Sequence, residues 1–332
     1  MTEMLCFTDI TTDPYYNLAA EEFLFTGLQE PVFRLWRNSP SVIVGRYQNA
    51  AAEINAGYVE SHGIPVVRRL TGGGAVFHDL GNVNYTFIDK KVPGEDTSAM
   101  FRRFTAPVLE ALREIGVDAS LQGRNDLVID GRKFSGNAVC VQGDRVLQHG
   151  TLLFASSVTD LSAALNTRPE KFTGKGVQSN RARVTNISEH LPAGCSMSVE
   201  DFILYLRDFV ILRTGCVCRD YTEDEKVSIN ALRKGKYALW DWNYGHSPRY
   251  GMNQTRRFPW GFVEVSLDVR GGVIRTCSIR GDYFFIRPTE EVEQAIAGLP
   301  HSYDAVKAIL STMPLSEYFG PVTAEELAGL FV

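Results

Sequence analysis

The residues with the clearest chemical potential lie in RRLTGGGAVFHDLGN, at residues 68–82. Gly72, Gly73 and Gly74 let the backbone take positive φ angles and approach a ligand closely, as an anion-binding turn requires. Arg68 and Arg69 would supply positive charge. A tight structural turn with solvent-facing arginines explains three glycines equally well. The Walker A pattern GxxxxGK[ST] is absent, and GKGVQS ends in serine where the dinucleotide fingerprint needs glycine.

A second segment, GRNDLVIDGRKFSGNA at residues 123–138, carries a basic pair beside a turn. Asp130 and Gly131 predict a hairpin turn, so Arg132 and Lys133 begin the return strand with side chains on opposite faces. One of the two can therefore face inward. A lysine beside a turn is usually a solvated surface residue, whereas the polar, glycine-spaced FSGNA that follows favours a lined cavity.

Two further segments carry polar groups. QHGTLLF at residues 148–154 places His149 and Thr151 on an expected strand, where alone they would be polar residues at the edge of a core. FTGKGVQSNRARVTNISE at residues 172–189 is a basic loop with two glycines. It is either a solvated loop or a mobile lid that closes on a phosphate.

The elements expected around these segments define an α+β fold. Alternating strands joined by tight turns predict a mixed, largely antiparallel sheet with flanking helices. The pattern predicts helices at residues 14–29, 51–63 and 98–116, and strands at 32–38, 41–48, 63–69 and 83–89. Two hairpins follow between residues 127 and 154, with turns at Asp130-Gly131 and Gly143-Asp144.

The character of the sequence changes near residue 245. An aromatic, Gly- and Pro-rich stretch there leads to a predicted hairpin at 262–281 and to helical patterns at 289–299, 302–313 and 323–331. This length suffices for a small α+β domain. We therefore expect two domains, at residues 1–245 and 246–332.

Charge and composition exclude several classes. The chain has 34 Lys+Arg against 39 Asp+Glu, which argues against broad nucleic-acid binding and leaves a local basic pocket open. No apolar stretch reaches the length of a membrane span, and MTEMLCFTDITTD lacks a basic segment followed by an apolar run. We therefore expect no nucleic-acid or membrane partner and a cytoplasmic location. The six cysteines form no CxxC pair, so reduced thiols are expected.

The four segments in this order resemble the lipoate–protein ligase family, whose catalytic domain has the biotin/lipoate ligase-like fold. WDWNYG at residues 240–245, which leads into the small C-terminal domain, resembles the entry to the family's accessory domain. The resemblance covers nearly the whole chain. It implies ATP- and magnesium-dependent activation of lipoate to lipoyl-AMP with release of pyrophosphate. Transfer then follows to a lysine of lipoyl acceptor domains, those of 2-oxoacid dehydrogenase E2 subunits or the glycine cleavage H protein.

The resemblance also implies roles for particular residues. Lys133 matches the family's essential lysine, whose ammonium would lie between the acyl carbonyl and the α-phosphate and counter the charge that builds on both. Asn125 and Asp126 would border the nucleotide, and Asp126 is the candidate ligand for magnesium. The loop at about 172–184 would order over the adenylate. The other residues implied in substrate or ATP binding are Arg69, Thr71, Gly72, Gly73, Gly74, Ala75, Val76, Phe77, His78, Asn82, His149, Thr151, Lys175 and Arg183.

Two alternatives stay open. Octanoyl and lipoyl transferases share the catalytic fold but use a cysteine nucleophile, for which Cys140 is the candidate. Its place in the apolar run AVCVQ predicts a buried, inert thiol instead. A non-catalytic lipoate-binding protein is the other alternative, and the intact Lys133, Arg69 and glycines argue against it.

Overall fold

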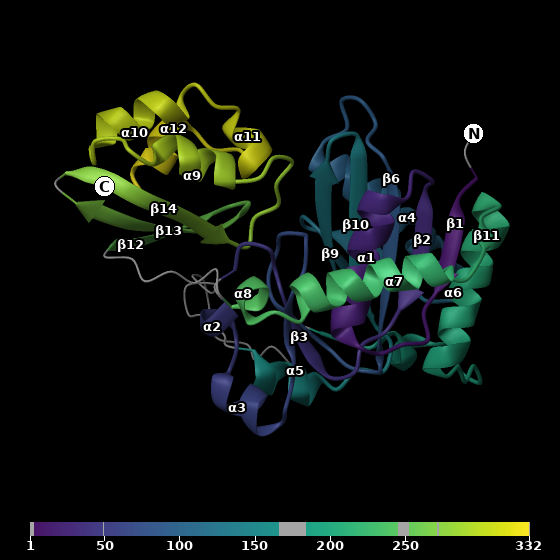
Figure 1. The fold of residues 1–332 in the computed structure, drawn as a ribbon. Helices are drawn as coiled ribbons and strands as arrows, with labels where there is room; N and C mark the ends of the chain where they lie inside the picture. Colours follow the sequence, from purple (N-terminus) through teal and green to yellow (C-terminus); the bar gives the residue numbers. More distant parts are fainter. Residues whose placement is uncertain (1–2, 49, 166–183, 245–251, 271, 332) are drawn as a thin grey trace.

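The computed structural model describes residues 3–48, 50–165, 184–244, 252–270 and 272–331. Figure 1 shows a large part that contains the N-terminus and a smaller part that ends at the C-terminus. No helix in these ranges is long and apolar enough to cross a membrane.

An eight-stranded sheet forms the centre of the large part, in the order β11-β1-β2-β6-β10-β9-β8-β7. Strand β1 runs parallel to β2 and β11, and the other neighbours are antiparallel. The mixed, largely antiparallel α+β prediction is therefore confirmed. The strands are β1 (Leu5–Thr8), β2 (Val32–Trp36), β6 (Asn82–Lys90), β7 (Ser120–Gln122), β8 (Asp126–Ile129), β9 (Arg132–Gln142), β10 (Arg145–Leu153) and β11 (Val217–Cys218).

A second sheet carries the glycine loop. Its three strands, β3 (Ser41–Val44), β4 (Val66–Arg68) and β5 (Val76–His78), lie in the order β4-β3-β5. Strand β3 is parallel to β4 and antiparallel to β5. The loop of residues 69–75 therefore connects the two strands that flank β3.

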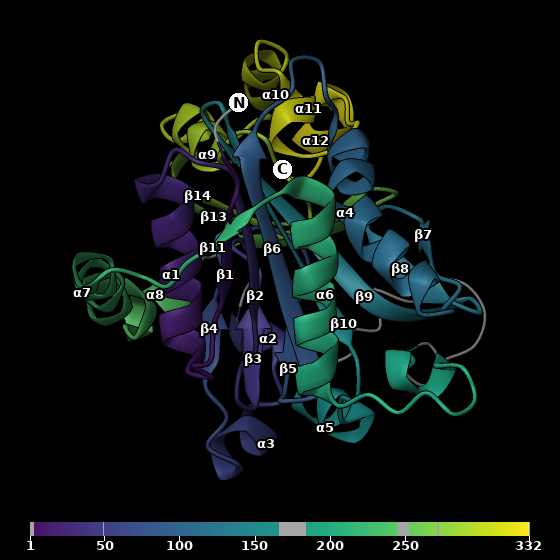
Figure 2. The same ribbon diagram turned by 90° about the vertical axis from the view of Figure 1, so that its right-hand side faces the viewer.

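The helices cover both faces of the large sheet. Figure 2 shows α1 (Pro14–Gly27) on one side, and α4 (Thr97–Glu114) and α6 (Val199–Thr214) on the other. The predicted helices at 14–29 and 98–116 are confirmed. The single helix predicted at 51–63 is wrong, because Asn55 caps a new helix with its side chain and divides the segment into α2 (Ala50–Glu53) and α3 (Ala56–Ser61).

Helices α6 and α7 (Glu223–Leu232) were not predicted. Each begins with a capping box, formed by Ser198 with Asp201 and by Thr222 with Glu225. That signal is readable in the sequence. Among the residues that the structure describes, the remaining helical segments of the large part are α5 (Val158–Ala164), a 3₁₀ turn (Ile187–His190), a π-helical turn (Arg233–Tyr237) and α8 (Trp240–Asn243).

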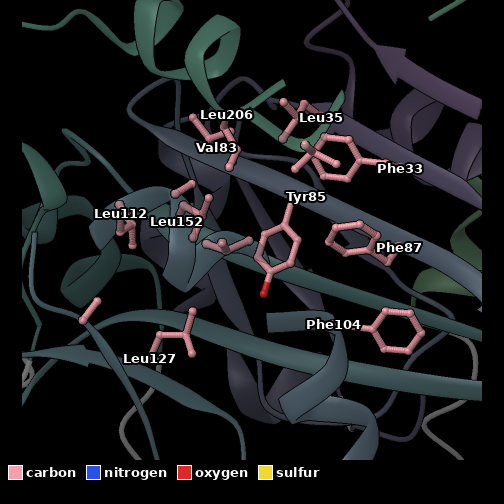
Figure 3. Close-up of a cluster of buried hydrophobic side chains, with 14 of the residues drawn as sticks. Phe33, Leu35, Val83, Tyr85, Phe87, Phe104, Leu112, Leu127, Leu152 and Leu206 are labelled. Carbon is pink, nitrogen blue, oxygen red and sulfur yellow. The ribbon is translucent and has the colours of Figure 1, made fainter. Parts of the chain in front are cut away.

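The two faces of the large sheet differ in chemistry. On β6, Val83, Tyr85 and Phe87 belong to the apolar core under α4 and α6, together with Phe104 and Leu206 (Figure 3). The alternate residues of β6 face α1, where the Thr86 hydroxyl donates to Glu21. Period-two alternation thus separates one packed apolar core from a second face, where polar groups such as Thr86 lie among apolar ones such as Ile88.

The C-terminal part has its own antiparallel sheet, β12-β13-β14, covered by short helices (Figure 1). The predicted hairpin is confirmed as β13 (Gly261–Arg270) and β14 (Val273–Gly281), and the three predicted helices as α9 (Glu290–Ile296), α10 (Tyr303–Leu310) and α12 (Ala324–Ala328). Strand β12 (Met252–Phe258) and helix α11 (Leu315–Tyr318) were not predicted. The expected boundary between residues 245 and 246 falls outside the described residues.

Candidate active site

A tight turn positions Lys133. Asp130 and Gly131 both have positive φ angles, 51° and 72°, which is the backbone of a two-residue hairpin turn. Lys133 is therefore the second residue of β9. Its Nζ atom lies 2.8 Å from Asp126 Oδ1 on β8, and the two side chains are 41% and 39% exposed. The ammonium is held in place and open to a ligand.

Arg69 holds the glycine loop from inside. Its Nη2 atom donates to the carbonyl oxygens of Gly72 and Gly74, at 2.7 and 2.8 Å. Between them, Gly73 has a φ angle of 89°, which a side chain would disfavour. Burial lowers the pKa of Arg69 to about 10, so the guanidinium is still charged at neutral pH. It therefore both shapes the loop and brings positive charge to it.

Arg68 has a different role from the one expected. Its side chain donates to the backbone carbonyls of Gly45, Arg46, Gln48, Trp242 and Asn243. It is fully buried and lines neither cavity described below. Arg68 thus ties β4 to two other segments, and of the adjacent pair Arg69 alone faces the site.

The C-terminal part touches the glycine loop. The amide of Gly73 donates to the carbonyl of Tyr283 at 3.4 Å, and a Cβ added to Gly72 would lie 2.2 Å from that same oxygen. Gly72 is therefore required by this close approach. Next along the chain, the ring of Phe284 lies under the Arg124 guanidinium, 4.3 Å from it.

Two cavities meet at Lys133. The narrow one, of about 120 Å³, has apolar walls that include Leu18, Trp36, Ile43 and Ala138. The wide one, of about 670 Å³, is bordered by Asp126 and opens toward β8 and α5. Both cavities are lined by Ala75, Val76, Lys133, Gly136 and Thr151. Since Gly136 comes from FSGNA, the interpretation of that motif as a cavity wall is confirmed.

His78 is a neutral group in this site. Burial, with the nearby charges of Arg69 and His149, lowers the pKa of His78 to about 3. Its Nδ1 atom lies 3.1 Å from Asn38 Nδ2, so it accepts a hydrogen bond. His78 therefore contributes shape and polarity rather than charge.

Most of the predicted site residues come together. Those that line one or both cavities are Arg69, Gly73, Gly74, Ala75, Val76, Phe77, His78, Asn125, Asp126, Lys133, His149 and Thr151. Thr71, Gly72 and Asn82 line neither and instead support their neighbours. Asn82, for example, donates to Asn84, which does line the narrow cavity. Lys175, Arg183 and the expected lid at 172–184 lie outside the described residues, except for Val184.

Several polar residues of this site were not predicted, among them Asn137 and Glu21. Asn137 lines the narrow cavity, and its amide oxygen accepts from Gln148 and from the Tyr85 hydroxyl. Glu21 on α1 is 1% exposed and contacts His149. A signal for Glu21 exists, because it lies on the same helical stripe as Leu18 and Leu24, where an acid is unexpected.

The thiol of Cys140 is unsuited to nucleophilic attack. It is 8% exposed, lines neither cavity, and burial raises its pKa to about 12. The prediction of a buried thiol is confirmed.

Within the described ranges, no group of three His, Cys, Asp or Glu residues could hold a metal ion. Asp126 offers one carboxylate beside the wide cavity. One carboxylate is the number that Mg²⁺ commonly takes when substrate phosphates supply the other ligands.

Comparison with protein families identifies the class. Residues 13–210 match the lipoyl protein ligase A/B catalytic domain, and residues 247–331 match the bacterial lipoate protein ligase C-terminus. The chain therefore belongs to the lipoate–protein ligase family.

Individual relatives agree along the whole length. The chain is 41% identical to lipoate-protein ligase LplJ of Bacillus subtilis, over 96% of each chain. It is 37% identical to lipoate–protein ligase 1 of Staphylococcus aureus, over 96% of this chain and 97% of the relative. These similarities support lipoate–protein ligase function.

Solved structures show the same fold. LipL1 of P. falciparum in complex with lipoate superposes with a TM-score of 0.78 at 25% identity, over 94% of this chain and 95% of that one. A lipoate-protein ligase A bound with ATP gives a TM-score of 0.63 at 28% identity, over 74% of this chain and 99% of that one.

Proposed function

We propose that this protein uses ATP to convert free lipoate to lipoyl-AMP and then transfers the lipoyl group to a lysine of an acceptor domain. The observation that carries the proposal is the position of Lys133 where a narrow cavity with apolar walls meets a wide one that Asp126 borders. Lipoate has an apolar tail and an anionic head, so such a junction suits its carboxylate. Solved relatives with ATP and with lipoate support both substrates.

In the first step, a carboxylate oxygen of lipoate attacks the α-phosphorus of ATP and pyrophosphate leaves. The tail would occupy the narrow cavity, beside Trp36 and Ile43, and the phosphates the wide one. Negative charge grows on the phosphate oxygens during this step. The Lys133 ammonium and the loop held by Arg69 would stabilise that charge.

In the second step, the ε-amine of the acceptor lysine attacks the acyl carbonyl and AMP leaves. The same ammonium would then stabilise the carbonyl oxygen as it becomes negative. No covalent enzyme intermediate is needed, which agrees with the burial of Cys140.

Magnesium would enter with the nucleotide. Asp126, which borders the wide cavity, would hold it through its carboxylate, and the ion would offset phosphate charge. The proposed acceptors are lipoyl domains of 2-oxoacid dehydrogenase E2 subunits and the H protein. A ligase from Thermoplasma acidophilum described with its E2 lipoyl domain supports the first, at 29% identity and a TM-score of 0.64. A cytoplasmic location stays an expectation.

ATP–pyrophosphate exchange tests the proposal. Purified protein with ATP, Mg²⁺ and labelled pyrophosphate should incorporate label into ATP only when lipoate is present. A transferase would instead accept an octanoyl group from a carrier protein without ATP, and Cys140→Ala would abolish that transfer. A binding protein would retain lipoate on equilibrium dialysis and catalyse neither reaction. Either of these results would refute the proposal.

A further inference from the structure

A buried chain of hydrogen bonds joins helix α1 to the glycine loop. Arg69 Nε donates to Thr71 Oγ1 at 2.9 Å, and Thr71 Oγ1 lies 2.8 Å from His149 Nε2. His149 Nδ1 lies 2.9 Å from both carboxylate oxygens of Glu21. These four residues come from α1, β10 and the loop, and none is more than 9% exposed. Among them, Arg69 and His149 line the narrow cavity.

The contacts order the chain from Glu21 to Arg69. A carboxylate only accepts hydrogen bonds, so His149 Nδ1 carries a proton that faces Glu21. On the other side of the ring, Nε2 lies 2.8 Å from Thr71 Oγ1, which also accepts from Arg69 Nε. Glu21 thereby fixes the His149 ring, and the ring fixes the Thr71 hydroxyl that bonds to the arginine.

The carboxylate of Glu21 is kept ionised in this setting. Burial acts to raise its pKa, but the facing His149 ring and Arg34 outweigh burial and lower it. Burying a carboxylate costs free energy unless charges and hydrogen bonds compensate for it. The hydrogen bonds of Glu21 lead to His149 and Arg69, which line the narrow cavity.

Glu21 also holds an aromatic residue that lines the narrow cavity. Its Oε1 atom accepts from the Thr86 hydroxyl at 2.8 Å, and Thr86 in turn accepts from Trp36 Nε1 at 3.0 Å. The indole of Trp36 lines the narrow cavity. One carboxylate therefore fixes both an aromatic wall and, through two intermediates, the arginine that clamps the glycine loop.

We propose that Glu21 and His149 are positioning residues that set the orientation of Arg69 through Thr71, and so the shape of the lipoate end of the site. The kinetic consequence of this inference rests on the proposed function. Its structural consequence rests on the hydrogen-bond chain alone. Loss of the Glu21 carboxylate should change the protonation of His149 directly. Through Thr71 and Arg69 it should then change the glycine loop, and so kcat/KM for lipoate.

The test compares Glu21→Gln with Glu22→Gln. Glu22 is the next residue of the same helix. It forms an ion pair with Lys236 at 2.7 Å and takes no part in the hydrogen-bond chain. Glu21→Gln should lower kcat/KM for lipoate in ATP–pyrophosphate exchange by about tenfold to a hundredfold, while KM for ATP changes little. Glu22→Gln should match the wild type. Circular dichroism and the urea midpoint should show that both variants fold.

A double mutant tests the coupling. Thr71→Val removes the relay between His149 and Arg69, so Glu21→Gln should have little further effect in that background. Additive losses in the double mutant would overturn the proposal, because Glu21 would then act by another route. Equal activity of Glu21→Gln and Glu22→Gln would overturn it as well.

Nitrogen NMR separates this inference from the proposed function. The ¹⁵N shifts of His149, assigned with His149→Gln, should show the proton on Nδ1 in the wild type and in Glu22→Gln. They should change in Glu21→Gln. This result needs no enzymatic activity, so an inactive protein would refute the ligase proposal and leave the hydrogen-bond chain tested. Identical ¹⁵N shifts in all three proteins would refute the chain.

Discussion

The two faces of the eight-stranded sheet use alternate residues of the same strands for different purposes. Toward α4 and α6, Val83, Tyr85 and Phe87 of β6 pack into an apolar core (Figure 3). Toward α1, Thr86 and its register partner His149 on β10 form hydrogen bonds with Glu21. The first face is packed with apolar side chains, and the second adds to its apolar contacts the polar groups that arrange the cavity. Substitutions on the two faces should therefore be separable by measuring stability and activity together.

The apolar face should show the largest loss of stability. Leu206 on α6 is fully buried and lines neither cavity. Leu206→Ala should lower the free energy of unfolding in urea by about 2–5 kcal/mol, through lost burial and the cavity left behind. Its activity per folded molecule should stay within about twofold, since most substitutions outside a site act on stability. A normal stability with a large loss of activity would break the comparison.

The polar face should lose less stability and more function. Thr86→Val leaves Trp36 Nε1 without its acceptor and Glu21 without a donor, so we expect a loss of about 1–3 kcal/mol and a raised KM for lipoate.

Thr105→Val is the matched control for Thr86→Val. Thr105 is also fully buried, and its hydroxyl donates to the Phe101 carbonyl within its own helix α4. Thr105→Val should leave KM for lipoate unchanged and should lower the free energy of unfolding by no more than about 1 kcal/mol. A raised KM in Thr105→Val would show that the two faces are not independent.

His78, on β5 of the three-stranded sheet, should give the site a pH signature. Its pKa is lowered by burial to about 3 in the folded chain, while the unfolded chain keeps the ordinary value of 6.5. As pH falls below 6.5, the unfolded state binds a proton that the folded state refuses, so stability falls. The contribution between pH 7 and pH 5 is about 2 kcal/mol. Urea titrations at pH 7 and pH 5 should show this loss of unfolding free energy in the wild type. In His78→Gln, the loss between the same two pH values should be smaller by the contribution of His78.

Cys140 should give the smallest effect. Cys140→Ala removes one buried sulfur from β9 and should leave exchange activity within about twofold of the wild type. Steady-state exchange rates check this. A large loss would favour a covalent role for the thiol.

Local rules predicted the elements near the site well. The turns at Asp130-Gly131 and Gly143-Asp144 placed three strands correctly, because residues tolerant of positive φ define such turns. Strand β12 escaped prediction because most of its residues are exposed and show no apolar alternation. Edge strands of this kind are specified by pairing with their neighbour, which sequence pattern does not reveal.

Site residues were predictable where they stand in contiguous motifs. They were not predictable where the fold brings together residues that are far apart in the sequence. The glycine loop and Lys133 stand in short recognisable segments. Glu21 lies 128 positions from its partner His149, so the tertiary fold brings them together. Arg68 and Arg69 show the opposite case. They are adjacent and had the same predicted role, but Arg68 bonds to Asn243 and Arg69 to the glycine loop.

The most direct test of the account is lipoate-dependent ATP–pyrophosphate exchange by Lys133→Ala beside the wild type. Lys133 is 41% exposed, so the variant should fold normally and its urea midpoint serves as the control. Removing the ammonium should lower the exchange rate about 10²- to 10³-fold, as loss of one group that stabilises transition-state charge commonly does. Exchange within a few-fold of the wild type would contradict the claim that the reaction takes place where the two cavities meet.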